Sequence, residues 1–95
     1  MKTNIKEFAG TKIREKRIAL NISQQDLADF LQLTRVSIMN IEKGRHFPSV
    51  TVLYAICCAL NMQPNEIFPP VKPLKISTKK VTQTVTVTRT KKIFS

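Results

Sequence analysis

The side chains best suited to specific recognition in this sequence are Arg35 and Asn40, which fall on one predicted helix. An Arg guanidinium can bind the O6 and N7 atoms of guanine together, and an Asn amide can bind adenine in the same bidentate way, each good pair favouring the correct base by about 1–3 kcal/mol. Val36 can touch a thymine methyl group, and Ser37 is an adaptable polar neighbour. These four are the candidate base-reading residues. The alternative for Arg35 is a phosphate contact, and for Asn40 a solvated surface position.

The segment that must position these side chains, residues 23–44, has the pattern of two short helices joined by a tight turn. Ser23 and Thr34 can cap the two helices, because a short hydroxyl side chain accepts bonds from amides that have no partner within the helix. Asp26 can return the bond at the first cap. Gly44 can take the left-handed conformation that ends a helix. The apolar residues form two faces that must pack together. They are Leu27, Ala28 and Leu31 on the first helix and Ile38 and Ile41 on the second.

With these features in place, residues 10–68 resemble the Cro and phage-repressor helix-turn-helix family. The resemblance implies an all-α fold in which five helices surround one small core. It assigns residues 1–70 to a DNA-binding domain and leaves residues 71–95 as a basic extension. The matching segments are Lys-Ile-Arg-Glu-Lys-Arg, Ser-Gln-Gln-Asp-Leu-Ala, Asn-Ile-Glu-Lys-Gly, Pro-Ser-Val and Asn-Glu-Ile-Phe.

The expected helix boundaries follow from caps, stops and prolines. The first helix begins near Phe8 or Thr11 and reaches Leu20, which with Ile13 faces the core, and Asn21 ends it because Asn tolerates the left-handed conformation. Gln32 stands where the family often has Gly, so a left-handed turn there costs on the order of 1 kcal/mol. The remaining helices are expected over residues 23–31, 34–43, 49–60 and 65–68, with Ser49 as the N-cap of the helix over 49–60.

The resemblance also implies where phosphates are bound. Gln24 corresponds to a family glutamine that bonds a phosphate, and a helix N-terminus suits an anion; the alternative is an idle exposed amide. Lys43, Arg45 and His46 follow the second helix of the motif, where they can bind the next phosphates or form a solvated loop. His46 is the only histidine and no acid or nucleophile accompanies it, so we expect no catalysis, no metal and no cofactor.

Arg17 and Glu42 form the pair that we interpret as structural. In many family members the residues at these positions make a partly buried salt bridge that ties the first helix to the third. A charge on an otherwise apolar face needs such a partner. We therefore expect this bridge to orient the recognition helix.

The distribution of charge favours a polyanionic partner. Residues 1–70 carry nine basic and six acidic residues, whereas residues 71–95 carry seven basic and no acidic ones, giving +10 in all. Each phosphate neutralised by such a surface releases condensed counterions.

No apolar run is long enough to span a bilayer and no signal peptide is evident, so we expect a cytoplasmic protein. Cys57 and Cys58 are adjacent, a spacing that suits neither a disulfide that closes a loop nor a zinc site, so we interpret them as small hydrophobic residues.

The fourth predicted helix is apolar nearly all round, with Val52, Ala55 and Cys58 where the family usually has polar residues. A helix with two apolar faces is buried twice, and a second subunit explains this best. A two-fold dimer would place two recognition helices about 34 Å apart on an inverted repeat. The expected interface residues are Tyr54, Ala55, Cys58, Met62, Val85 and Val87.

The last two of these residues belong to the alternating segment 81–90, whose β-branched pattern predicts a strand. A lone strand is not stable in water. It therefore pairs with a second copy, packs on the helical domain of its own chain, or remains a disordered basic arm.

Taken together, the residues and the resemblance predict a transcriptional regulator that binds a specific double-stranded DNA operator, acting as a homodimeric repressor. No small-molecule pocket is apparent in the sequence. The alternative is a protein-interaction module, such as an antitoxin that binds a toxin and regulates its own operon.

Overall fold

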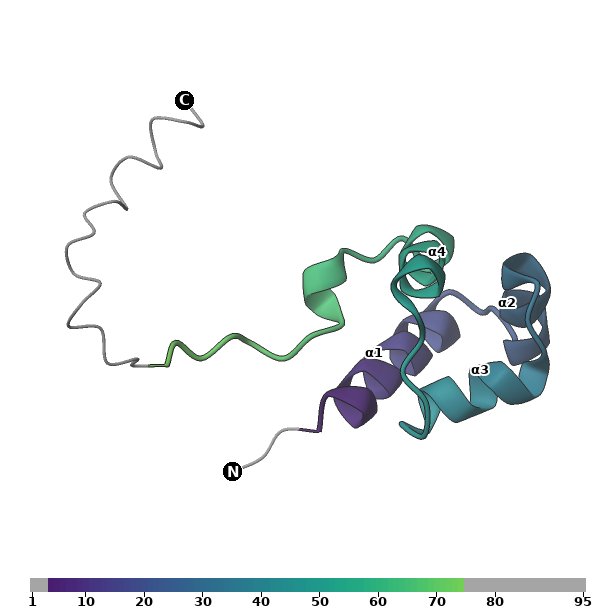
Figure 1. Cartoon of the computed structure of the whole chain (residues 1–95). Coiled ribbons are helices and arrows are strands. Elements are labelled where there is room, and N and C mark those ends of the chain that lie inside the picture. The colour runs from purple at the N-terminus through teal and green to yellow at the C-terminus, as the bar shows by residue number, and fades with distance from the viewer. Residues whose placement is uncertain (1–3, 75–95) are drawn as a thin grey trace.

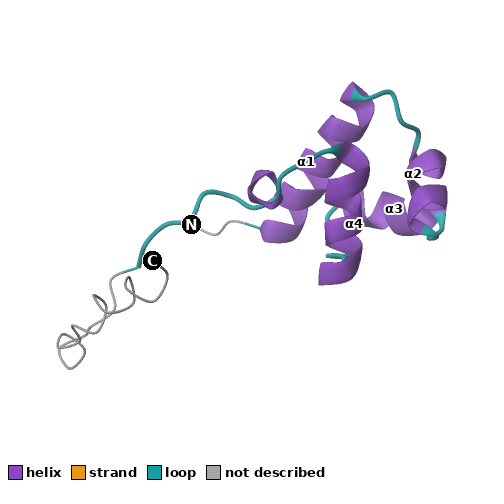
Figure 2. Cartoon of the chain, turned by 90° about the horizontal axis from the view of Figure 1, so that it is seen from above, coloured by secondary structure: helices purple, strands orange, loops and turns teal. Residues whose placement is uncertain are grey.

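The computed structural model describes residues 4–74, and in that range the chain forms four α-helices and one turn of 3-10 helix (Figure 1). Figures 1 and 2 show α2 and α3 side by side at one end of the bundle, with α1 and α4 packed against them. The predicted all-α class is confirmed. The elements are α1 (Ile5–Ala19), α2 (Gln24–Leu31), α3 (Arg35–Glu42), α4 (Val50–Leu60) and the 3-10 helix η1 (Pro64–Glu66).

Each α-helix begins with a short polar side chain that accepts a hydrogen bond from the amide three residues on, as helix capping requires. Ser23, Thr34 and Ser49 cap α2, α3 and α4 as predicted, with bond lengths of 2.9, 3.0 and 3.2 Å. The predicted start of α1 was wrong, because Asn4 Oδ1 accepts from the Glu7 amide at 3.1 Å and the helix begins earlier, at Ile5.

All four α-helices end in one way. A residue with positive φ follows the helix, and the amide of the next residue bonds to the carbonyl five positions back, which is the six-to-one bond of the Schellman motif. The left-handed residues are Asn21, Gln32, Gly44 and Asn61, with φ of 58°, 59°, 77° and 55°. The six-to-one bonds are Ile22 to Arg17, Leu33 to Ala28, Arg45 to Asn40 and Met62 to Cys57, with lengths of 3.0, 2.8, 2.9 and 2.9 Å.

One apolar core joins the four α-helices and the segment after α4. Ala28 is fully buried, as expected for a small residue where α2 meets its neighbours. Leu20 is 43% exposed, so its predicted core position was wrong: α1 ends at Ala19, and the chain turns at Asn21 before Ile22 reaches the core. The largest fully buried side chains are Ile13, Leu27, Ile38, Ile56, Leu60 and Ile67.

The predicted fifth α-helix is instead the single 3-10 turn at Pro64–Glu66. Pro64 and Pro69 bracket this segment, and a residue before proline avoids the α conformation. Too few residues remain for an α-helical turn, and the amides of Glu66 and Ile67 bond three residues back at 2.9 and 3.0 Å.

The described chain continues beyond η1 as an extended segment that leaves the bundle (Figure 1). The predicted strand over residues 81–90, with Val85 and Val87, lies outside the described residues. Among residues 4–74 no helix is long and apolar enough to cross a membrane.

Candidate nucleic-acid interface

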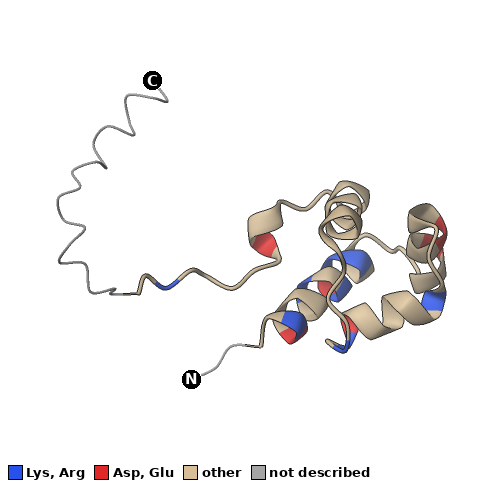
Figure 3. Ribbon diagram, in the orientation of Figure 1, with Lys and Arg blue, Asp and Glu red and all other residues tan. Residues whose placement is uncertain are grey.

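The outward side of α3 carries the candidate base-reading residues. Arg35 and Val36 are exposed in the first turn, and Asn40 is half-buried one turn further on. Val36, Asn40 and Lys43 share a face, because residues four and three positions apart are neighbours on a helix. Figure 3 shows basic residues on α1, at the beginning of α3 and in the loop after α3, whereas α2 carries only acidic charges.

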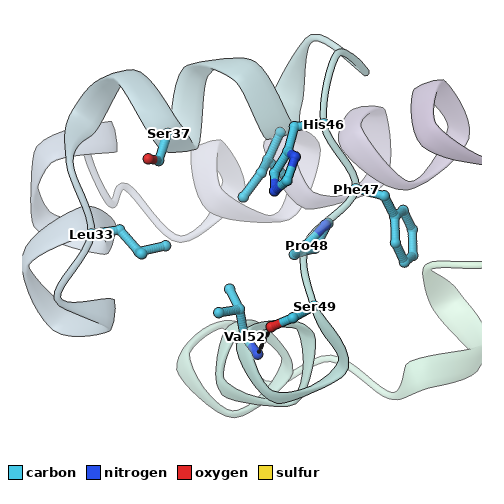
Figure 4. A pocket seen from close by; sticks show the side chains of 8 residues that line it. Leu33, Ser37, His46, Phe47, Pro48, Ser49 and Val52 are labelled. Carbon is cyan, nitrogen blue, oxygen red and sulfur yellow. Dashed lines mark hydrogen bonds between the residues drawn. The ribbon is translucent and has the colours of Figure 1, made fainter.

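Ser37 stands apart from the other three candidates. Its hydroxyl lies 3.0 Å from Thr34 Oγ1, so it takes part in the cap of α3. It also lines an open groove of about 310 Å³ between α3, the loop after it and α4, shown in Figure 4. His46, Phe47 and Val52 line the same groove, and Figure 4 shows the Phe47 ring turned away from the other labelled side chains. Ser37 is therefore less free to contact a ligand of α3 than Arg35 or Val36.

The loop after α3 is held close to that helix. Gly44 takes the left-handed conformation, and Arg45 turns back so that its Nη1 lies 3.4 Å from Asn40 Oδ1. Phe47 packs against Phe68 with ring centroids 6.1 Å apart, which ties the loop to the segment after η1. The exposed cations of Lys43 and Arg45 thus stand beside the C-terminal end of α3.

The structure brings Arg17 and Glu42 together in the interior. Arg17 Nε donates to Glu42 Oε2 at 2.6 Å and Arg17 Nη2 donates to Glu42 Oε1 at 3.0 Å. The two side chains are 9% and 2% exposed. Arg17 Nη1 also donates to the Ile22 carbonyl at 2.8 Å. In this bidentate geometry the third guanidinium nitrogen bonds to the backbone, which is the arrangement a buried ion pair requires.

Gln24 has a partner inside the protein that the sequence did not reveal. Its Nε2 donates to Glu42 Oε1 at 3.1 Å, so the first residue of α2 joins the Arg17–Glu42 pair. The spacing of these three residues in the sequence gives no sign of this contact. Only the packing of α2 against α3 creates it.

Gly10 is a residue of the site that sequence reasoning missed. A Cβ atom there would lie 2.4 Å from the Ile41 carbonyl oxygen and 2.6 Å from that of Glu42. Glycine inside a helix costs about 0.5–1 kcal/mol relative to alanine, so a glycine in the middle of an amphipathic segment was the available signal. It allows α1 to touch the C-terminal end of α3.

The outer face of α4 carries most of the predicted interface residues. Tyr54 is 69% exposed, Cys58 is exposed and Ala55 is half-buried. The prediction for Met62 was wrong, because this residue is only 6% exposed and belongs to the core. Met62 follows the left-handed Asn61, and an apolar residue at that position of a Schellman motif packs back on its own helix.

The two cysteines differ in environment. Cys57 is buried, and burial, with Cys58 and Glu66 adding to it, raises the pKa of its thiol. Cys58 is exposed on the outer face of α4.

The sequence pattern of the helix-turn-helix family matches residues 13–67. An uncharacterized HTH-type transcriptional regulator of Methanothermobacter thermautotrophicus is 40% identical over 53 residues, which are 56% of this chain and 77% of that protein. One from Archaeoglobus fulgidus is 34% identical over 58 residues, covering 61% of this chain and 82% of the relative.

Among solved structures, the restriction-modification controller protein C.AhdI from Aeromonas hydrophila has a TM-score of 0.60 at 31% identity, covering 67% of this chain and 96% of that chain. The DNA-binding domain of BldD, with a TM-score of 0.61 at 20% identity, shares the fold, over 73% of this chain and 100% of its own. The family match and the relatives agree with the arrangement of helices described above. The chain belongs to the helix-turn-helix family of the Cro/C1 type, a family of DNA-binding transcriptional regulators.

Proposed function

We propose that this protein binds a specific double-stranded DNA operator and represses transcription there as a cytoplasmic homodimer. The observation that carries the proposal is the outward side of α3. Arg35, Val36 and Asn40 are presented on a helix whose opposite side is fixed to α1 by a buried ion pair. An anchored helix with such side chains suits the major groove, where base edges offer distinct patterns of donors and acceptors.

In this proposal the phosphate contacts flank the recognition helix. Gln24 lies at the beginning of α2, and Lys43, Arg45 and His46 follow the C-terminal end of α3. Contacts on both sides of a recognition helix fix its position on the duplex without reading sequence. The domain that makes them is residues 1–70, and the seven basic residues in 71–95 add nonspecific attraction.

The homodimer is proposed from the outer face of α4. Tyr54 and Cys58 are four positions apart and share the exposed side of the helix, with Ala55 beside them. Two copies related by a two-fold axis would present two α3 helices to half-sites one helical turn apart. The operator expected for such a dimer is an inverted repeat.

The test is selection of bound sequences from random duplexes, followed by affinity measurements on the selected duplex. The expected result is a palindromic consensus whose preference is lost in Arg35→Ala and Asn40→Ala. Arg35→Lys keeps the charge but not the planar fork, so specificity at one position should still fall. Arg14→Ala, an exposed arginine on α1, is the charge-matched control. Equal affinity of the unmodified protein for all sequences overturns the proposal.

The repressor role has its own readout. Placing the selected duplex across a promoter should lower transcription of a reporter when the protein is present. Unchanged or increased transcription would remove repression from the proposal and leave DNA binding standing.

A further inference from the structure

Gln24 and Gln25 are neighbouring glutamines at the beginning of α2, but their side-chain amides have different partners. Gln24 Nε2 donates at 3.1 Å to Oε1 of Glu42, the buried carboxylate at the C-terminal end of α3. Gln25 Nε2 donates to Asp29 Oδ1 at 2.8 Å on the exposed surface of the same helix. The first contact joins two helices, whereas the second stays within one.

The chemistry of Glu42 fixes the orientation of the Gln24 amide. An ionised carboxylate only accepts hydrogen bonds, so the nitrogen of Gln24 must face it and the carbonyl oxygen must face away. The same nitrogen carries a second N–H. Within residues 4–74 this nitrogen donates to no protein group other than Glu42, so its second N–H is available to a ligand.

Arg17 bonds to the Glu42 carboxylate and also to the backbone of the chain before α2. It makes two bonds to Glu42 and donates to the Ile22 carbonyl at 2.8 Å. The beginning of α2 is therefore attached at two points, the Ile22 backbone and the Gln24 side chain, to one ion pair. Every buried side-chain nitrogen and oxygen in residues 4–74 has a partner, so this network is complete without a further protein group.

We infer that Glu42 is a positioning residue for DNA binding, which turns the Gln24 amide so that its second Nε2–H donates to a phosphate oxygen. Glu42 is the last residue of α3. The phosphate contact of α2 and the placement of the recognition helix are then set by the same carboxylate. This inference rests on the proposed function, because it assigns the orientation of a proposed phosphate contact.

The first test needs no DNA. Nuclear magnetic resonance of the full chain with ¹⁵N label resolves the side-chain amides of Gln24 and Gln25. The hydrogens of Gln24 should exchange with solvent more slowly than those of Gln25, and Glu42→Gln should move the Gln24 signals while leaving Gln25 unchanged. Equal exchange rates in the unmodified protein overturn the inference, even if Glu42→Gln does not fold.

The second test measures affinity for the selected duplex. Gln24→Ala should weaken binding about tenfold or more, the usual loss for a hydrogen bond to a charged group. Gln25→Ala, the matched control, should stay within about twofold, since it removes no hydrogen bond to a charged partner outside the domain. Glu42→Gln should weaken binding by a larger factor in the unmodified background than in the Gln24→Ala background, because part of its effect passes through the Gln24 contact. Additive losses overturn the inference.

The two proposals fail in different ways. Sequence-independent binding by the unmodified protein removes the operator-binding function, whatever the amide signals show. Specific binding in which Gln24→Ala and Gln25→Ala behave alike removes only the role given to Glu42.

Discussion

Glu42 brings a charge into the interior of the domain, where its side chain is 2% exposed and accepts bonds from Arg17 and Gln24. Desolvating two charges costs several kcal/mol per ion before their attraction is counted. A buried pair is thus weak evidence for stability on its own. What it does supply is a fixed relative placement of α1, α2 and α3, because each of its bonds has a defined direction.

The pair makes a prediction at the scale of residues. Arg17→Ala and Glu42→Ala should each lower the free energy of unfolding by about 3–5 kcal/mol, since each leaves an uncompensated buried charge. The double variant should lose less than the sum of the two single variants. Urea unfolding of the four proteins checks this. Losses that simply add would show that the two side chains do not interact directly.

At the scale of elements, backbone strain depends on which residue type takes the left-handed conformation after each helix. Asn21 and Asn61 adopt positive φ readily, and Gly44 does so without cost. Gln32 is the exception, because a longer side chain with a φ of 59° is disfavoured. This residue closes α2 at the turn of the helix-turn-helix, so the strain lies within the recognition motif itself.

Gln32→Gly is expected to stabilise the protein by about 1 kcal/mol by relieving that strain. For a domain of this size the melting temperature should rise by about 4–8 °C. Asn61→Gly is the matched control and should change the melting temperature less, because Asn already tolerates the conformation. Scanning calorimetry measures both. A fall in melting temperature for Gln32→Gly would mean that its side chain contributes more than its backbone costs.

At the scale of the whole molecule, α4 has two apolar faces, one buried and one exposed. Leu53, Ile56 and Leu60 are buried in the core, whereas Tyr54 stays largely exposed. An aromatic side chain of this size left in water favours burial against a partner. The exposed face lies on a different element from the outward side of α3, so dimerisation and DNA binding need not compete for the same residues.

If the proposed homodimer forms through the outer face of α4, Tyr54→Glu is expected to convert it to monomer, because the substitution places a charge at the centre of the apolar contact. Phe30→Glu is the matched control, since Phe30 is an aromatic of similar exposure on α2, at 63% against 69% for Tyr54. Equilibrium sedimentation of both variants and the unmodified chain at micromolar concentration gives their masses. A monomer in all three samples, or loss of the dimer in Phe30→Glu alone, would contradict the interface.

The local sequence by itself determined that four α-helices form, with three of their four N-caps and the Gly44 stop, because capping and stopping depend on residues within a few positions of one another. It also identified the residue types on the outward side of α3. The bond from Gln24 to Glu42, the fit of Gly10 against α3 and the burial of Met62 were decided only by the tertiary structure. Each depends on groups that are distant in sequence and meet only when helices pack, and no local pattern encodes that distance.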